Sequence, residues 1–254
     1  MEVALADAAA AGLSSFLVSP FVCIVDKSII SNASGRMPLF QCMVDSFKEL
    51  IARPHAFLRR PEFGWIFSLY GLTYLTANWT DSLCEYAERD KTIPKFLTTS
   101  AVNLTVCIAK DRAFTRMFGV VSPKPLPVAT YGLFATRDMM TIFTSFSVPS
   151  HMASFLQSRD IVSQRNAHTV AQLACPMAVQ LVSTPLHLLG LDLYNRPKQS
   201  TMSRLAFIGR EYTKSTLARL CRIGPAFGIG GVSNKFLRDS FHGYLHPQKS
   251  PETM

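Results

Sequence analysis

Charged residues are scarce in this chain. Asp, Glu, Lys and Arg make up 17% of the residues, whereas ordinary soluble chains carry about 25%. The chain also lacks a long uninterrupted apolar run of the kind that forms a single membrane anchor. Its apolar segments, which raise the hydrophobic share to 48%, are interspersed with Ser, Thr, Asn and Gly. This mixture favours helices that face lipid on one side and a polar interior on the other.

The sequence also lacks recognisable catalytic and metal-binding motifs. The six cysteines are scattered without a CxxC pair or a Cys/His metal spacing, so they are interpreted as buried thiols rather than a disulfide framework. No catalytic Ser/His/Asp or Cys/His grouping and no phosphate loop is present. We therefore expect no enzyme activity, no catalytic residue, no metal and no cofactor. The net charge of +9 is compatible with nucleic-acid binding, but the basic residues lack the clustered form of such patches, so nucleic acid is not an expected partner.

The N-terminus carries no basic residue before Lys27. A secretory signal needs a positive start, and a transit peptide is rich in Arg. We expect any targeting information to lie inside the chain.

Two sequence patterns recur three times and in alternation. The first is centred on Pro20, Leu104 and Pro185, and the second has an aromatic-Gly-aliphatic core at Gly71, Gly132 and Gly228. The steps between copies of the first are 84 and 81 residues. The patterns predict one membrane domain, 1–254, of three repeats of two helices each, with boundaries listed here: about 1–90, about 91–160 and about 161–246, followed by a tail, 247–254.

Six apolar segments give the expected membrane helices. They cover about 3–25, 63–83, 96–109, 128–148, 169–193 and 217–241. Pro20 near the end of the first segment is expected to kink it. The fold class is therefore predicted to be all-α, with six transmembrane helices.

Short surface helices are expected as well. Apolar residues recur at helical spacing within 36–60, at Leu39, Met43, Phe47, Leu50 and Ile51. This spacing predicts an amphipathic helix on a membrane surface, or alternatively a surface helix of a soluble protein. A second surface helix is expected within 196–222.

Basic residues gather in alternate connections. The segments 26–62, 110–125 and 190–222 hold 17 of the 26 Lys and Arg residues. If these connections lie on one face of a membrane, that face is strongly positive, as the charge bias of short loops predicts. Both termini are then expected on the opposite face.

Taken together, the repeats, the proline positions and the aromatic-Gly cores resemble the mitochondrial carrier family over nearly the whole chain. The resemblance implies a multi-pass protein of the inner mitochondrial membrane, with the outer membrane as the alternative. It also implies contact with the lipid bilayer, including cardiolipin, and a small-molecule substrate of unknown identity.

The gate motif of that family is missing. Its odd helices carry Pro-x-Asp/Glu-x-x-Lys/Arg, but the corresponding residues here are Val22 and Val25, Val106 and Ala109, and His187 and Gly190. The nearest charges are displaced by one or two positions, at Asp26, Lys27, Lys110, Asp111 and Asp192. They could form a substitute network, but the favoured interpretation is that they are solvated charges at helix ends. His187 is expected to be a packed polar residue.

Arg137 and Asp138 are the main candidates for a substrate site. They follow Gly132 by five and six residues on the fourth apolar segment, and an ionisable pair inside such a segment is a functional candidate. The resemblance implies that this position contacts substrate, and the Arg-acid pair resembles the type associated with amino acids. The alternative is that the two charges neutralise each other. Matching positions in the other repeats add four candidates: Thr76, Asn78, Asn234 and Lys235.

These observations lead to two functional hypotheses. The first is transport of a small metabolite, of amino-acid or carboxylate type, across the inner mitochondrial membrane. The second is a non-transporting protein that acts in membrane-protein insertion, scaffolding or organelle organisation. The missing gate charges favour the second hypothesis, and the Arg137–Asp138 pair favours the first.

Overall fold

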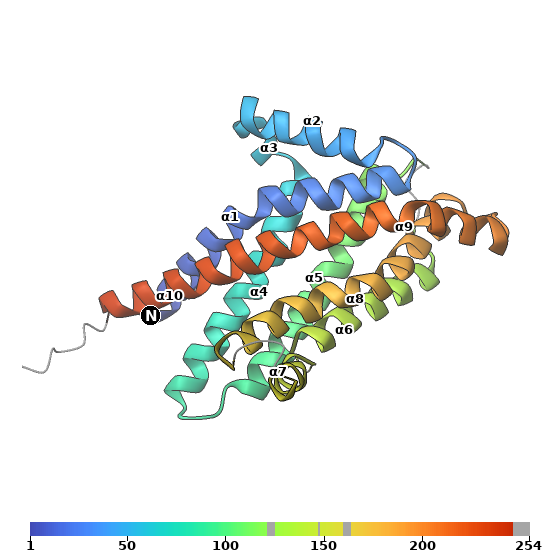
Figure 1. Cartoon of the computed structure of the whole chain (residues 1–254). Helices are drawn as coiled ribbons and strands as arrows, with labels where there is room; N and C mark the ends of the chain where they lie inside the picture. Colours follow the sequence, from blue (N-terminus) through green and yellow to red (C-terminus); the bar gives the residue numbers. More distant parts are fainter. Residues whose placement is uncertain (121–124, 147, 160–163, 246–254) are drawn as a thin grey trace, which may run out of the picture.

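The protein is a bundle of long helices (Figure 1). A computed structural model describes residues 1–120, 125–146, 148–159 and 164–245. Within these ranges every regular element is helical, which confirms the all-α class. The predicted tail, 247–254, lies outside the described residues.

Each predicted apolar segment coincides largely with a long helix or helical run, although the fourth, 128–148, extends past the end of its helix at Phe146. The first five are α1 (Glu2–Ala33), α4 (Pro61–Tyr86), α5 (Thr92–Phe118), α6 (Val128–Phe146) and α8 (Gln164–Asn195). They are followed by α9 (Thr201–Ile223), the π-helix η1 (Gly224–Gly231) and α10 (Val232–Leu245). In space α1 packs on α4, α4 on α5, α5 on α6, α6 on α8 and α8 on α9, and the last helices return to α1. The long helices therefore form a closed ring.

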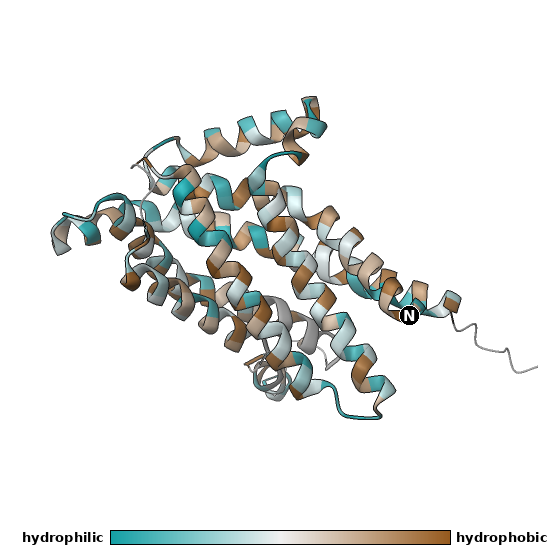
Figure 2. Cartoon of the chain, turned by 180° about the vertical axis from the view of Figure 1, so that it is seen from behind, coloured by the Kyte–Doolittle hydropathy of each residue, from teal (hydrophilic) through white to brown (hydrophobic). Residues whose placement is uncertain are grey.

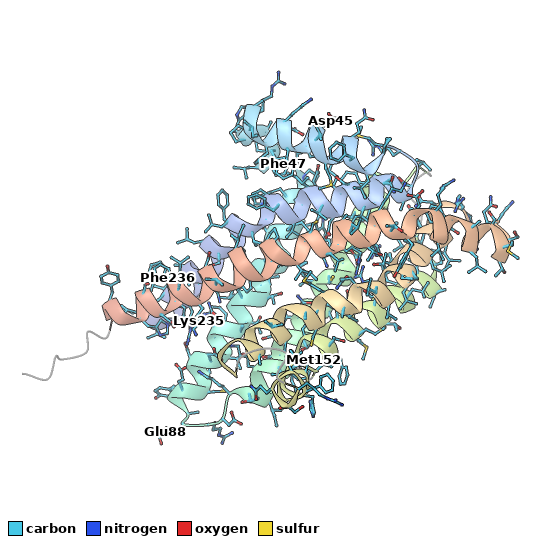
Figure 3. All side chains as sticks on the ribbon, in the orientation of Figure 1. Asp45, Phe47, Glu88, Met152, Lys235 and Phe236 are labelled. Carbon is cyan, nitrogen blue, oxygen red and sulfur yellow. The ribbon has the colours of Figure 1, made fainter. Side chains whose placement is uncertain are left out.

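Three shorter helices complete the chain: α2 (Leu39–Ala52), α3 (Pro54–Leu58) and α7 (Val148–Ser158). The helix predicted within 36–60 is α2, which lies along the outside of α1 (Figure 1). Met43, Phe47 and Leu50 pack against the hydrophobic core, whereas Asp45 points away from the bundle (Figure 3). The helix is confirmed, but Ile51 of the predicted apolar face is exposed. The position of α2 on a membrane surface stays a prediction.

The C-terminal helices differ from the prediction. The expected second surface helix and the sixth apolar segment form one unbroken run, α9–η1–α10. Gly224 keeps right-handed helical angles, φ −53 and ψ −59, so nothing ends the helix there. The Gly-rich segment is accommodated by wider π-helical turns. The helix α7 was not predicted.

The long helices bury polar side chains alongside apolar ones and also expose large apolar side chains. On α1 the buried side chains include Ser14, Ser15 and Ser19, whereas Leu13 and Phe16 are exposed. Hydrophobic and hydrophilic residues alternate along the helices when the ring is seen from behind (Figure 2). A helix of a soluble protein normally keeps its polar face toward solvent. Buried polar side chains and exposed large apolar ones on the same helix fit lipid surroundings, where polar side chains face the bundle interior.

The predicted count of six membrane helices goes beyond what the described residues show. Among the described residues, two helical segments are long and apolar enough to cross a bilayer: Glu2–Ala33 and Ala174–Asn195. The other long helices carry too many polar and charged side chains to pass by length and composition.

The structure does not show a threefold repeat. Pro20, Leu104 and Pro185 lie inside α1, α5 and α8, but the three glycine markers have unlike surroundings. A Cβ on Gly71 would lie 3.4 Å from Ser15 Oγ, because α1 and α4 approach closely there. Gly132 and Gly228 have open space at the same position, and Gly228 belongs to η1. The repeat boundaries stay a prediction.

The three connections that were expected to share one face start from neighbouring helix ends. Ser34, after α1, donates a hydrogen bond to the carbonyl of Phe118 at 2.8 Å, and a Cβ on Gly119 would lie 3.0 Å from Asn195 Oδ1. The C-terminal ends of α1, α5 and α8 are therefore neighbours. The N-terminus lies beside the end of α10, at the other end of the bundle (Figure 1).

Candidate functional site

Buried charges from different helices meet inside the ring. Asp26 comes from α1, Lys110 and Asp111 come from α5, and Arg137 and Asp138 come from α6. All five are buried, Asp111 completely. We call these residues, together with His187 of α8 and Arg219 and Arg222 of α9, the central cluster.

Lys110 links two helices of the central cluster. Its Nζ lies 2.8 Å from Asp26 Oδ2 and 2.6 Å from Asp111 Oδ1. Asp26 also pairs with Arg222, whose Nη1 is 3.1 Å from Asp26 Oδ1. These contacts hold α1, α5 and α9 together through charge-assisted hydrogen bonds, which are the stronger kind.

Arg137 makes the corresponding link on the opposite side. Its Nη2 lies 2.6 Å from Asp111 Oδ2 and 2.5 Å from Asp138 Oδ1, and its Nη1 lies 2.8 Å from His187 Nδ1. The donors of the planar guanidinium thus contact side chains of α5, α6 and α8 and link these three helices. Arg137 and Asp138 do pair with each other, but the pair also reaches two neighbouring helices.

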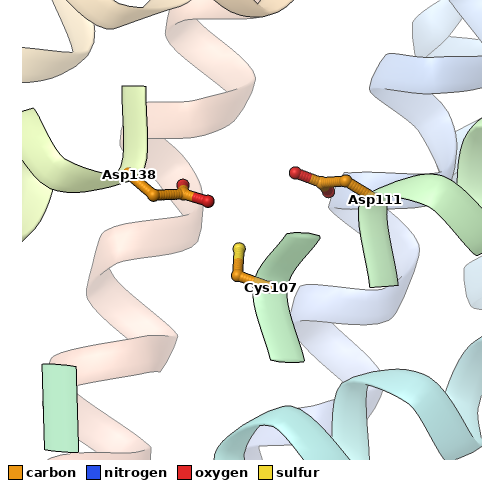
Figure 4. Close-up of side chains that lie close together, drawn as sticks. All are labelled: Cys107, Asp111 and Asp138. Atoms are coloured by element: carbon orange, nitrogen blue, oxygen red, sulfur yellow. The ribbon is translucent and has the colours of Figure 1, made fainter. Parts of the chain in front are cut away.

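Three potential metal ligands point toward one another in this region, as Figure 4 shows. One ligand atom from each of Cys107, Asp111 and Asp138 lies within 4.8 Å of the others. The Nη2 of Arg137 contacts all three, with Cys107 Sγ at 3.6 Å. The group holds a guanidinium, which a metal ion would have to displace.

A small cavity lies in the middle of the central cluster. Its volume is about 10 Å³, and its lining is mostly charged: Asp26, Ile29, Ile30, Lys110, Asp111, Arg137, His187, Arg219 and Arg222. A cavity of this size has room for about one water molecule. The cavity is therefore too small to hold anything larger than a water molecule.

The burial of the displaced charges corrects one prediction. Asp26, Lys110 and Asp111 were expected to be solvated helix ends, but they lie in the interior because partners from three helices surround them. Lys27 pairs with Glu62 at 3.1 Å, and the buried Asp192 pairs with arginines of the basic stretch. The alternative, a substitute network, describes the observed arrangement.

A second polar cluster lies toward the N-terminal end of α1. Asp7 is fully buried and accepts hydrogen bonds from Ser82 at 2.5 Å and Arg238 at 3.0 Å. His242 Nε2 lies 2.9 Å from the same carboxylate. We call these residues the terminal cluster. It joins α1, α4 and α10, and 19 residues of α1, about 28 Å at 1.5 Å per residue, separate Asp7 from Asp26.

The six candidate substrate residues lie in two places. Arg137 and Asp138 belong to the central cluster. Asn78 and Asn234 form a reciprocal pair at 3.0 and 2.9 Å, and Asn78 also donates to the backbone oxygen of Asp7, beside the terminal cluster. Thr76 donates to Leu72 of its own helix. Lys235 is exposed on α10 (Figure 3).

Six members of the central cluster were not among the substrate candidates, and besides Asp26, Lys110 and Asp111 these are His187, Arg219 and Arg222. Arg219 and Arg222 were assigned to a surface helix, because the stretch that contains them is basic. Their spacing of three residues places both on one side of α9, which is the signal that could have indicated a shared site. His187 is buried, as predicted, but it also contacts Arg137.

Buried charges converge inside a ring of long helices, and large apolar side chains such as Leu13 and Phe16 are exposed. This arrangement is typical of a membrane-embedded helical bundle with a polar interior. The comparisons with known families make this more specific. The chain belongs to the family described as "Probable citrulline exporter", whose model matches residues 10–242. A search of curated proteins found no match.

The family assignment corrects the resemblance to mitochondrial carriers, which is wrong. The recurring patterns that carried it are short apolar motifs, and the gate motif that would have distinguished that family is missing. The implied mitochondrial location and the cardiolipin contact lose their support with it. An exporter family indicates a membrane transporter of a small metabolite rather than an enzyme.

Proposed function

We propose that this protein exports a neutral amino acid of the citrulline type across a membrane, and that the central cluster is the substrate site. The observation that carries the proposal is the match to an exporter family over residues 10–242. The closed ring of helices supports it, because the charges inside the ring converge on one cavity.

The charges of the central cluster suit a zwitterion. Citrulline carries one ammonium and one carboxylate on the same carbon, and its side chain is neutral. A site that holds both cations and carboxylates can exchange internal ion pairs for pairs with the ammonium and the carboxylate of such a substrate.

Asp138 is proposed to bind the substrate's ammonium group. Its Oδ1 accepts from Arg137, but its buried Oδ2 has no hydrogen-bond partner among the described residues. A buried acceptor without a partner is costly, and an ammonium group would satisfy it. Arg137 is proposed to contact the substrate as well, after the helices separate. Thr76, Asn78, Asn234 and Lys235 are proposed as contacts on the pathway toward the terminal cluster.

All six long helical segments, α1, α4, α5, α6, α8 and α9–η1–α10, are proposed to span the membrane. Several of these segments are less apolar than an ordinary membrane-spanning helix, because their polar side chains face the cluster instead of lipid.

Transport assays with the purified protein in liposomes test this function. Labelled citrulline, a cationic amino acid and an anionic amino acid should be compared at equal concentrations. We expect citrulline to be transported in preference to both charged amino acids. If a folded protein transports none of the three, the export function is wrong and a scaffolding role is favoured.

A further inference from the structure

Arg219 differs from the other cations of the central cluster. Its side chain is buried, with 4% of the residue exposed. Its Nε donates to Gln180 Oε1 at 2.9 Å, and its Nη2 donates to Ser183 Oγ at 3.4 Å. Both acceptors are neutral, and the described residues place no carboxylate within ion-pair distance of its guanidinium.

Each carboxylate of the cluster already pairs with at least one cation other than Arg219. Asp26 pairs with Lys110 and Arg222, and Asp111 pairs with Lys110 and Arg137. Asp138 pairs with Arg137 as well. Four cations therefore face three carboxylates, and Arg219 is the cation that remains. A buried charge without a counter-charge is unfavourable, so the cavity beside it has a deficit of one negative charge.

The neutral acceptors hold the guanidinium in place without neutralising it. Gln180 donates its own Nε2 to the backbone oxygen of Pro176 at 3.0 Å, which directs its Oε1 toward Arg219. Only Nε and Nη2 of Arg219 are used in this way, so Nη1 has no hydrogen-bond partner among the described residues. Arg219 lines the cavity, where the free part of its fork is available to a ligand.

We propose that Arg219 binds the α-carboxylate of the transported amino acid and so determines the requirement for a carboxylate group. This inference rests on the proposed export function. Arg137 is a weaker candidate for this contact, because Asp111 and Asp138 already compete for its donors. Arg219 has no such competitor, and its planar fork matches a carboxylate in bidentate geometry.

A substrate analogue without the negative charge of the α-carboxylate tests the proposal. Citrulline and its α-carboxamide, which has a neutral amide in place of the carboxylate, should be compared in liposomes containing the parent protein or the variants Arg219→Lys and Arg219→Gln. We expect the parent to favour citrulline by about tenfold or more, the range for one charge-assisted contact. Arg219→Gln should lose this preference, and Arg219→Lys should keep part of it.

A matched control is available on the same helix. Arg210 is exposed on α9 and pairs with Glu211. Arg210→Gln removes the same charge from the same element, and it should leave both transport and the preference for citrulline unchanged. An Arg219→Gln protein that retains the parent's preference overturns the proposal, although it leaves the export function intact. Failure of the parent to transport citrulline is instead a failure of the export function.

A second variant tests the charge deficit directly. Gln180→Glu places a carboxylate where an amide oxygen now lies 2.9 Å from Arg219 Nε. We expect the melting temperature in detergent to rise by about 2–4 °C, because the added charge completes an ion pair. The same variant should transport citrulline more slowly, because the internal carboxylate occupies the substrate's position. A lower melting temperature, or unchanged transport, would show that Arg219 does not lack an anion.

If Arg219→Gln abolishes all transport, ligand-induced stabilisation gives the answer. Citrulline, but not its carboxamide, should raise the melting temperature of the parent protein. The variant should respond equally to both compounds. A variant that is still stabilised by citrulline alone would overturn the proposal.

Discussion

Lys110 Nζ and Asp26 Oδ2 lie 2.8 Å apart inside the helical ring, where they join α5 to α1. Both residues are buried. Removing one partner leaves the other as a buried charge, and such changes typically cost about 3–5 kcal/mol.

The first prediction concerns this pair. Lys110→Met should reduce the free energy of unfolding by about 3–5 kcal/mol, because Asp26 and Asp111 lose a shared cation. The double variant Asp26→Asn/Lys110→Met should recover part of the loss, since it removes one of those carboxylate charges. Denaturation of the purified variants in detergent measures both values. Equal stability of the parent and Lys110→Met would contradict the observed ion pairs.

Arg137 is expected to be needed for transport. Arg137→Lys keeps the charge but loses the planar fork that reaches Asp111, Asp138 and His187, so it should impair transport, and Arg137→Ala should abolish it. Neither change makes α6 more polar, so both proteins should still insert into the membrane. Uptake in liposomes, normalised to inserted protein, measures the effect. Parental transport by Arg137→Ala would remove Arg137 from the substrate site.

Close packing of α6 on α8 gives a prediction about stability. A Cβ on Gly190 would lie 2.6 Å from Phe134 Cε1, and overpacking of this kind costs about 1–3 kcal/mol. Gly190→Ala should therefore lower the melting temperature. Gly132→Ala, on the partner helix, meets open space and should be neutral or stabilising by about 0.5–1 kcal/mol. The reverse order of the two melting temperatures would show that the helices do not pack in this way.

Membrane topology follows from the arrangement of helix ends. Arg36 donates to the backbone oxygen of Met117 at 2.9 Å, after α1 and at the end of α5, and Arg204 lies in the basic stretch after α8. Single cysteines placed at 36 and 204 should react with a membrane-impermeant reagent from the same side. The labelling requires a background without the exposed Cys221. Reaction from opposite sides would contradict both the charge bias and the helical ring.

The sequence was sufficient to locate most helices, because their signals are local. Apolar segments interrupted by small polar residues indicated the long helices, and the spacing of Met43, Phe47 and Leu50 indicated α2. The continuous run through Gly224 could not be predicted, because a Gly-rich segment with Pro225 resembles a helix break. The helical form of η1 depends on tertiary packing, since η1 packs against α1, which is far away in the sequence.

The site was predicted in part. Arg137 and Asp138 were found because an ionisable pair stands out in an apolar segment. The sequence wrongly predicted that Asp26, Lys110 and Asp111 are solvated. Their burial depends on partners far away in the sequence, such as Arg222, which is 196 residues from Asp26. A single sequence contains no signal for such a pairing. For the same reason, Arg219 could not be distinguished from the other basic residues of its stretch.

The cavity of about 10 Å³ in the central cluster has a consequence for electrical insulation. A space for about one water molecule cannot hold a continuous file of waters along the bundle axis. The cavity therefore has no room for a hydrated ion beside the buried charges. An energised membrane would not discharge through this cavity while the helices around it stay together.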